Sequence, residues 1–314
     1  MRGFAALVLA MAAAPGALPA EQGAIPAGQA AVPAPAAGSE VALGDAASRM
    51  TVPVTIGSAG PFQFIIDTGA ERTVISRELA TTLGLSRGRE VRLTAMTGTS
   101  SVGTVVIPSL TVSDIASQSI EAPALLSANL GAPGMLGIDT LSGHSVSIDF
   151  DTNRMTVRPS TRRSRSADSV NGEIVVKAKS VYGQLIVTEA YYRSRRISIV
   201  IDTGAQVSMG NSALRDRMRH ELKTPQQITL TSVTGQSMLA DYTQVERLDI
   251  GGVGFNHLPI AFADVAPFRK FGLTKIPALM IGMDALRLFR HVDVDFANRE
   301  VRFSVPRSAY RTPD

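Results

Sequence analysis

Two apolar stretches of the chain each end in an aspartate. The first, FIID, ends at Asp67, and the second, IVID, ends at Asp202. Alternating runs of apolar and polar residues precede them, at 50–57 and 185–192. Alternation is typical of a strand with one buried face, and a short continuous apolar run is typical of a fully buried strand. The pattern therefore predicts two strand pairs, each of which brings one carboxylate to the end of a buried strand.

The elements that follow each aspartate recur in the same order, which indicates an internal repeat. A helix is predicted at 76–85 in the first copy and at 211–222 in the second. Ser76 and Asn211 stand at their starts, and both residue types are favoured N-caps. The next element in each copy is a candidate hairpin, LTAMTGTSSVG (93–103) and LTSVTGQSMLA (230–240).

Glycines mark the tips of these two candidate hairpins. Gly98 and Gly235 are predicted to supply the positive φ that such tips often require. Both copies close on a further hairpin, at 145–157 and 291–303. The acids on those last hairpins are interpreted as solvated strand edges and not as calcium ligands: Asp149, Asp151, Asp293 and Asp295.

Short strands with frequent turns, and few helices, predict a mostly β chain built from two similar β-barrel domains. The βαβ alternation of a parallel sheet is missing. The predicted domains are an N-terminal lobe at 49–158 and a C-terminal lobe at 173–306, with a basic linker at 159–172 and a tail at 307–314.

The N-terminus has the composition of a targeting segment. Arg2, an apolar core and small residues up to Ala20 predict a secretory signal peptide at 1–20, with an uncleaved anchor as the alternative. Residues 21–48 are rich in Ala and Pro and predict a flexible segment, either a pro-segment or a spacer. The expected location is therefore the bacterial periplasm or the medium, without a stable membrane span.

Composition argues against several classes of function. The chain has no Cys and only four His, without a spacing suited to metal binding, so no metal site or cofactor is expected. The net charge is only +4, and the one dense basic cluster lies at 160–168. We interpret that cluster as a solvated linker and expect no nucleic-acid partner.

The two Asp-Thr-Gly-Ala signatures and the elements around them resemble the aspartic proteases, in particular the retropepsin-like enzymes. The resemblance covers residues ~49–158 and ~173–306, which make up nearly all of the expected mature chain. It implies two retropepsin-like lobes in a pepsin-like, single-chain pair, in which the tips at Gly98 and Gly235 are flap candidates. It also implies that an apolar-apolar-Gly segment packs behind each catalytic turn, ending at Gly137 and Gly282.

The resemblance implies that Asp67 and Asp202 are the catalytic pair. Two neighbouring carboxylates cannot both ionise cheaply, so they share one proton, and one can activate water while the other protonates a carbonyl. The predicted supporting residues are small groups that let the two turns meet: Thr68, Gly69, Thr203 and Gly204. The flaps depart from pepsin-like enzymes because they carry no Tyr; Met96 and Val233 approach the tips instead.

Three alternatives stay open at this point. A lone Asp-Thr-Gly is also an ordinary turn, although two copies in matching contexts favour the protease. The same cleft could belong to a silent relative that binds a peptide or cell-wall ligand. Like copies could also pair between chains as a homodimer. The expectation is an aspartic endopeptidase acting on protein or peptide substrates as a monomer with an intramolecular pseudo-dimer.

Overall fold

The computed structural model describes residues 49–304, apart from 114, 161–172, 221, 223, 247 and 251–252, together with four short strands between residues 5 and 46. Most of the predicted signal peptide (1–20), of the segment 21–48 and of the linker 159–172 lies outside the described residues, as does the whole tail (307–314). Those boundaries therefore stay predictions.

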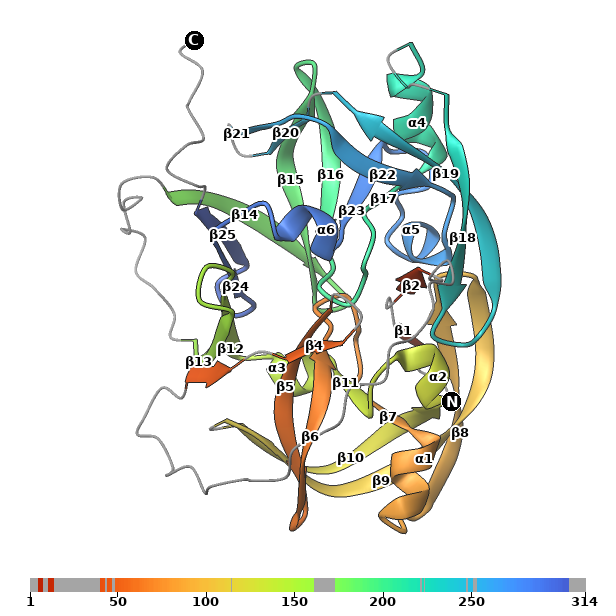
Figure 1. Ribbon diagram of the computed structural model, residues 1–314, viewed down its shortest axis with the longest axis vertical. Helices are drawn as coiled ribbons and strands as arrows, with labels where there is room; N and C mark the ends of the chain where they lie inside the picture. Colours follow the sequence, from red (N-terminus) through yellow and green to blue (C-terminus); the bar gives the residue numbers. More distant parts are fainter. Residues whose placement is uncertain are drawn as a thin grey trace, which may run out of the picture.

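The chain is mostly β, as predicted, and its elements repeat in two lobes (Figure 1). Strands of the first lobe are β5 (Arg49–Ile56), β6 (Ala59–Ile66), β7 (Val74–Ser76), β8 (Arg87–Ala95), β9 (Gly98–Val112), β10 (Ile115–Leu125), β11 (Gly134–Leu136), β12 (His144–Asp149) and β13 (Arg154–Pro159). Its helices are α1 (Arg77–Thr82), α2 (Ser127–Leu130) and α3 (Ile138–Leu141).

The second lobe, green to blue in Figure 1, follows the same plan. Its strands are β14 (Glu173–Val181), β15 (Gln184–Tyr192), β16 (Arg195–Ile201), β17 (Met209–Gly210), β18 (Gln226–Ser232), β19 (Ser237–Val245), β20 (Leu248–Ile250), β21 (Val253–Phe255), β22 (Leu258–Phe262), β23 (Ala278–Ile281), β24 (His291–Asp295) and β25 (Glu300–Ser304). Its helices are α4 (Ser212–Met218), α5 (Ala266–Lys270) and α6 (Met283–Leu286).

The predicted helix starts are confirmed. The Ser76 side chain accepts a hydrogen bond from the backbone N–H of Leu79, and the Asn211 side chain accepts one from that of Leu214. Both helices are shorter than the sequence pattern predicts: α1 ends at Thr82 and α4 ends at Met218.

In each lobe, the aspartate-bearing strand has a parallel neighbour, which in turn pairs with a short third strand. β11 pairs parallel to β6 and antiparallel to β7. Likewise, β23 pairs parallel to β16 and antiparallel to β17. The parallel neighbour pairs with the last residues of the apolar strand. It therefore fixes where that strand ends and where the next residue, the aspartate, lies.

The two lobes share one sheet on the side away from the candidate flaps, where β12 of the first lobe pairs antiparallel with β24 of the second (Figure 1). Within this seam the Ser147 hydroxyl lies 2.6 Å from His291 Nε2. β13 and β25 extend the sheet on either side. A continuous sheet with strands from both lobes therefore joins the lobes within one chain.

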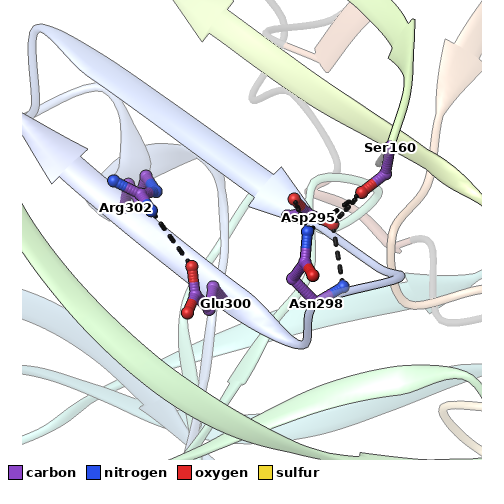
Figure 2. Close-up of polar contacts among 5 residues, drawn as sticks. All are labelled: Ser160, Asp295, Asn298, Glu300 and Arg302. Atoms are coloured by element: carbon purple, nitrogen blue, oxygen red, sulfur yellow. Dashed lines mark hydrogen bonds and ion pairs between the residues drawn. The ribbon is translucent and has the colours of Figure 1, made fainter. Parts of the chain in front are cut away.

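One acid of this shared sheet is buried, and Figure 2 shows its polar contacts. Asp295 is 7% exposed, and its carboxylate accepts hydrogen bonds from Ser160 Oγ at 2.6 Å and from Asn298 Nδ2 at 2.8 Å. The solvated-edge interpretation is thus wrong for Asp295, which ties Ser160, just after β13, to the last hairpin. Arg302 pairs with Glu300 nearby.

Four short strands precede the first lobe: β1 (Ala5–Leu7), β2 (Met11–Ala13), β3 (Glu40–Ala42) and β4 (Gly44–Ala46). β3 pairs with β13, and β4 pairs with β5, so part of the segment predicted to be flexible is structured. Exposed backbone groups at the edges of β5 and β13 explain this, since a sheet edge accepts a further strand. Within the part of the chain that the structure describes, no helix is long and apolar enough to span a membrane.

Candidate active site

Asp67 and Asp202 each follow the last residue of a buried strand. The backbone N–H of Asp67 donates to Leu136 O at 3.0 Å, and that of Asp202 donates to Ile281 O at 3.0 Å. Both aspartates are fully buried. The parallel neighbours β11 and β23 therefore fix the two acids in equivalent positions, one from each lobe.

A reciprocal set of hydrogen bonds between two threonines joins the turns that carry the acids. Thr68 Oγ1 donates to Ile201 O at 3.0 Å, and Thr203 Oγ1 donates to Ile66 O at 2.7 Å. Each hydroxyl also accepts from the other's backbone N–H, at 3.1 and 3.2 Å. All four bonds cross from one lobe to the other, so the predicted role of Thr68 and Thr203 in holding the two loops together agrees with the geometry.

The inner oxygen of each carboxylate is held by backbone N–H groups. Gly69 N–H donates to Asp67 Oδ1 at 2.8 Å, and Gly204 N–H donates to Asp202 Oδ1 at 3.0 Å. Gly204 also lies against the opposite acid, because a Cβ at this position would be 2.3 Å from Asp67 Cγ. The glycine leaves the space in which the two carboxylates approach each other.

The outer oxygens, Asp67 Oδ2 and Asp202 Oδ2, are buried and receive no hydrogen bond from any described residue. Two buried acceptors without a donor are costly, and one proton shared between them supplies the missing donor. The pair is therefore suited to carry one proton and one negative charge.

Burial dominates the electrostatics of the pair. The pKa of Asp67 is raised to about 6 by desolvation, which outweighs the opposing effects of the Gly69 hydrogen bond, the Asp202 hydrogen bond and the charge of Arg49. Desolvation also raises the pKa of Asp202 well above its ordinary value, and the charge of Asp67 raises it further. The two acids thus titrate as a coupled pair, and their apparent pKa values belong to the pair rather than to either acid.

The described residues contain no cluster of three or more His, Asp or Glu side chains that could hold a metal ion.

A sequence model of the family described as aspartyl protease matches two segments of the chain, residues 52–140 and 188–285. Each segment contains one Asp-Thr-Gly-Ala turn. The chain belongs to the aspartyl protease family. A comparison with curated proteins gives no significant match.

The tips of the two candidate flaps cross the gap between the lobes. Met96, next to the tip of the β8–β9 hairpin, packs into a hydrophobic cluster of the second lobe, and its carbonyl accepts from Ala266 N–H at 3.0 Å. Val233, next to the tip of the β18–β19 hairpin, packs into a cluster of the first lobe. The predicted tip glycines, Gly98 and Gly235, have φ values of 152° and 84°.

Behind each Asp-Thr-Gly turn, a second aspartate holds the following backbone in place. Asp139 accepts from Thr73 N and Oγ1 at 2.8 and 2.7 Å. In the second lobe, Asp284 accepts from Ser208 N and Oγ at 3.0 and 2.6 Å. The sequence shows both acids two residues after the repeated glycine, a signal that the sequence reasoning did not use.

Two further buried polar residues near the pair were also missed. Arg49 and Gln184 are both 0% exposed. Each opens the strand that pairs with an aspartate-bearing strand, so the repeat itself could have singled them out. The Gln184 amide donates to Gly69 O at 3.0 Å across the lobe boundary.

Thr203→Val tests the threonine hydrogen bonds between the two turns. Valine keeps the shape but leaves Ile66 O and Thr68 N–H buried without a partner, so the free energy of unfolding is expected to fall by about 2–4 kcal/mol. Urea unfolding measures the change. Thr81→Val is the control, because the Thr81 hydroxyl is exposed on α1 and bonds only within its helix. Equal losses in the two variants would contradict a special role for Thr203.

Proposed function

We propose that the chain is an exported aspartic endopeptidase that hydrolyses peptide bonds with a water molecule activated between Asp67 and Asp202. The observation that carries this proposal is the pair of buried, donor-less outer oxygens, one from each lobe. In the reaction, the ionised carboxylate takes a proton from water while the other carboxyl group protonates the peptide carbonyl oxygen. The resulting diol then transfers a proton to the amide nitrogen, and the C–N bond breaks to give an acid and an amine.

An extended peptide is the substrate shape that the hairpins favour. β1 pairs parallel to β8, and β2 pairs antiparallel to β18, so both candidate flaps accept an extended segment along their backbones. Backbone pairing of this kind binds extended peptides with little regard to sequence. It supports a protein or peptide substrate and leaves cleavage preference to side chains.

The proposed enzyme acts as a monomer. The Thr68–Thr203 bonds, the pairing of β12 with β24, and the Lys270–Glu71 ion pair at 2.5 Å all join the lobes within one chain. A homodimer of like copies would have to replace each of these contacts. The N-terminal composition supports export to the periplasm or the medium.

Incubation of the purified protein with a diverse peptide pool, read by mass spectrometry, tests the proposal. Discrete cuts that persist in the presence of a chelator are expected, because the mechanism needs no cofactor. Bound but uncut peptides across the pH range would instead identify a silent, peptide-binding relative.

The pH profile of cleavage follows from the buried pair. Below the pKa of Asp67, about 6, both acids are protonated and no base is present. Above the pKa of Asp202, which burial raises further, both are ionised and no acid is present. The rate is therefore expected to rise as the pH passes about 6 and to fall on the alkaline side. A maximum near pH ~2, as in strongly acidic enzymes, would contradict this.

A further inference from the structure

The first lobe places a cation next to its catalytic aspartate. β5 and β6 pair antiparallel with Thr51 opposite Ile65. Continuing this register by two residues brings Arg49 opposite Asp67. Arg49 is the first residue of β5, and its side chain is fully buried. The sheet register therefore places the backbone of this buried cation opposite that of the acid.

The second lobe places a neutral amide at the equivalent point. β15 and β16 pair with Ile186 opposite Val200, so the same continuation brings Gln184 opposite Asp202. Gln184 uses its amide to hold Gly69 of the other turn. The two lobes are thus alike in backbone and unlike in charge at this one position.

The Arg49 side chain is only partly satisfied. Its Nη2 donates to Leu130 O, while Nε and Nη1 are buried without a hydrogen-bond partner among the described residues. Gly131 makes room for it, because a Cβ there would lie 2.6 Å from Nη2. A buried guanidinium without a bonded carboxylate is costly, which favours a negative charge close by.

Asp67 and Asp202 are the charged groups that face Arg49. Both raise its pKa against the opposing effect of burial, with Asp67 the larger of the two. In return, Arg49 lowers the pKa of Asp67, adding to the larger lowering by the hydrogen bonds from Gly69 and Asp202. For Asp202, the main charged neighbour is Asp67, and its charge raises the pKa of Asp202. The field of Arg49 therefore acts unequally on the two acids.

We propose that Arg49 assigns the two roles within the pair, holding Asp67 as the ionised base and leaving the shared proton on Asp202. This inference rests on the proposed function for its catalytic meaning. Asp67 then takes the proton of the attacking water, whose oxygen bonds to the carbonyl carbon, and Asp202 gives its proton to the carbonyl oxygen. Arg49 is a positioning residue, because it acts through Asp67 and touches neither water nor substrate.

Arg49→Gln tests the proposal, since it gives the first lobe the side chain that the second lobe already uses. Removing the cation is expected to move the acid limb of the kcat/KM profile upward by about one pH unit. Arg49→Lys keeps the charge and is expected to restore most of the shift. Gln184→Met removes a buried hydrogen bond without a charge, and we expect it to lower activity without moving the acid limb.

Carbon-13 NMR titration of labelled aspartate carboxyl groups in the full chain provides a readout that does not need activity. Assignment by Asp67→Asn is expected to show Asp67 ionising first in the wild type and later in Arg49→Gln. A protein that titrates in this way but cuts no peptide would retain the inference and reject the proposed protease.

Two results would overturn the assignment: an unchanged acid limb in Arg49→Gln, or an equal shift in Gln184→Met. If Arg49→Gln does not fold, Gln184→Arg decides the question in an otherwise unchanged chain. A cation beside Asp202 is expected to lower the second apparent pKa of the pair, and no change there would refute the proposal.

Discussion

Asp67→Asn is expected to lower kcat/KM for peptide cleavage by about 10⁴-fold, because the pair loses the group that takes the proton from water. The same variant is expected to be more stable than the wild type at pH 7. Burial raises the pKa of Asp67, so its contribution to stability is fully present below the pKa of an unfolded aspartate and is lost as the pH rises through about 6. Asparagine avoids that loss, which amounts to about 1–3 kcal/mol.

Urea unfolding at pH 4 and pH 7 measures the stability effect alongside the cleavage rates. The gain from Asn is expected at pH 7 and should shrink at pH 4, where the wild-type carboxyl is protonated. Thr81→Val, on the exposed face of α1, serves as the control for both measurements. An inactive Asp67→Asn that is also unfolded would not support a catalytic role, whereas a folded variant with wild-type activity would contradict it.

Gly204→Ala is expected to reduce kcat/KM by at least about 100-fold, since it displaces the opposite carboxylate. The new methyl group would lie 2.3 Å from Asp67 Cγ and 2.5 Å from Oδ2. Asp67 cannot move aside freely, because Gly69 N–H holds its other oxygen at 2.8 Å. A displacement of about 1 Å at a catalytic group costs on the order of 100-fold in rate. Overpacking is also expected to lower the free energy of unfolding by about 1–3 kcal/mol.

Gly103→Ala is the matched control for this glycine. A Cβ at Gly103 would meet nothing within 4 Å, and the residue lies in strand β9, away from the two acids. Its activity and stability are expected to match the wild type. If Gly204→Ala is as active as Gly103→Ala, the close approach of Gly204 to Asp67 does not shape the site.

Local signals in the sequence predict much of the site. The apolar runs before Asp67 and Asp202 specify buried strands, and Ser76 and Asn211 specify helix starts, because each depends on residues a few positions apart. Because the Asp-Thr-Gly-Ala turn occurs once in each repeat, in matching surroundings, the two turns are predicted to form one site together. The mostly β class follows from the same short-range patterns.

Contacts between distant segments could not be predicted in this way. No local pattern shows that Met96 packs into the second lobe or Val233 into the first, since apolar residues near a hairpin tip fit many partners. The burial of Asp295 depends on Ser160, which is far from it in the sequence. Alternation along a strand predicts which residues share a face, and only the partner segment decides whether that face is covered.

Arg49 shows a different limit. A charged residue at the start of a strand usually lies in solvent, and charged side chains are rarely buried without a partner. The sequence position alone therefore favoured exposure. Comparison of Arg49 with Gln184, its equivalent in the second repeat, would have marked the position as unusual. It would not have predicted that Arg49 is buried.

The rate of peptide hydrolysis by Asp202→Asn, measured together with its sedimentation, tests the central claim most directly. One site built from both lobes predicts a folded monomer that has lost essentially all cleavage of the peptide that the wild type cuts best. A dimer that retains about half of the wild-type rate would show that like copies pair between chains, and it would contradict a single site formed by Asp67 and Asp202.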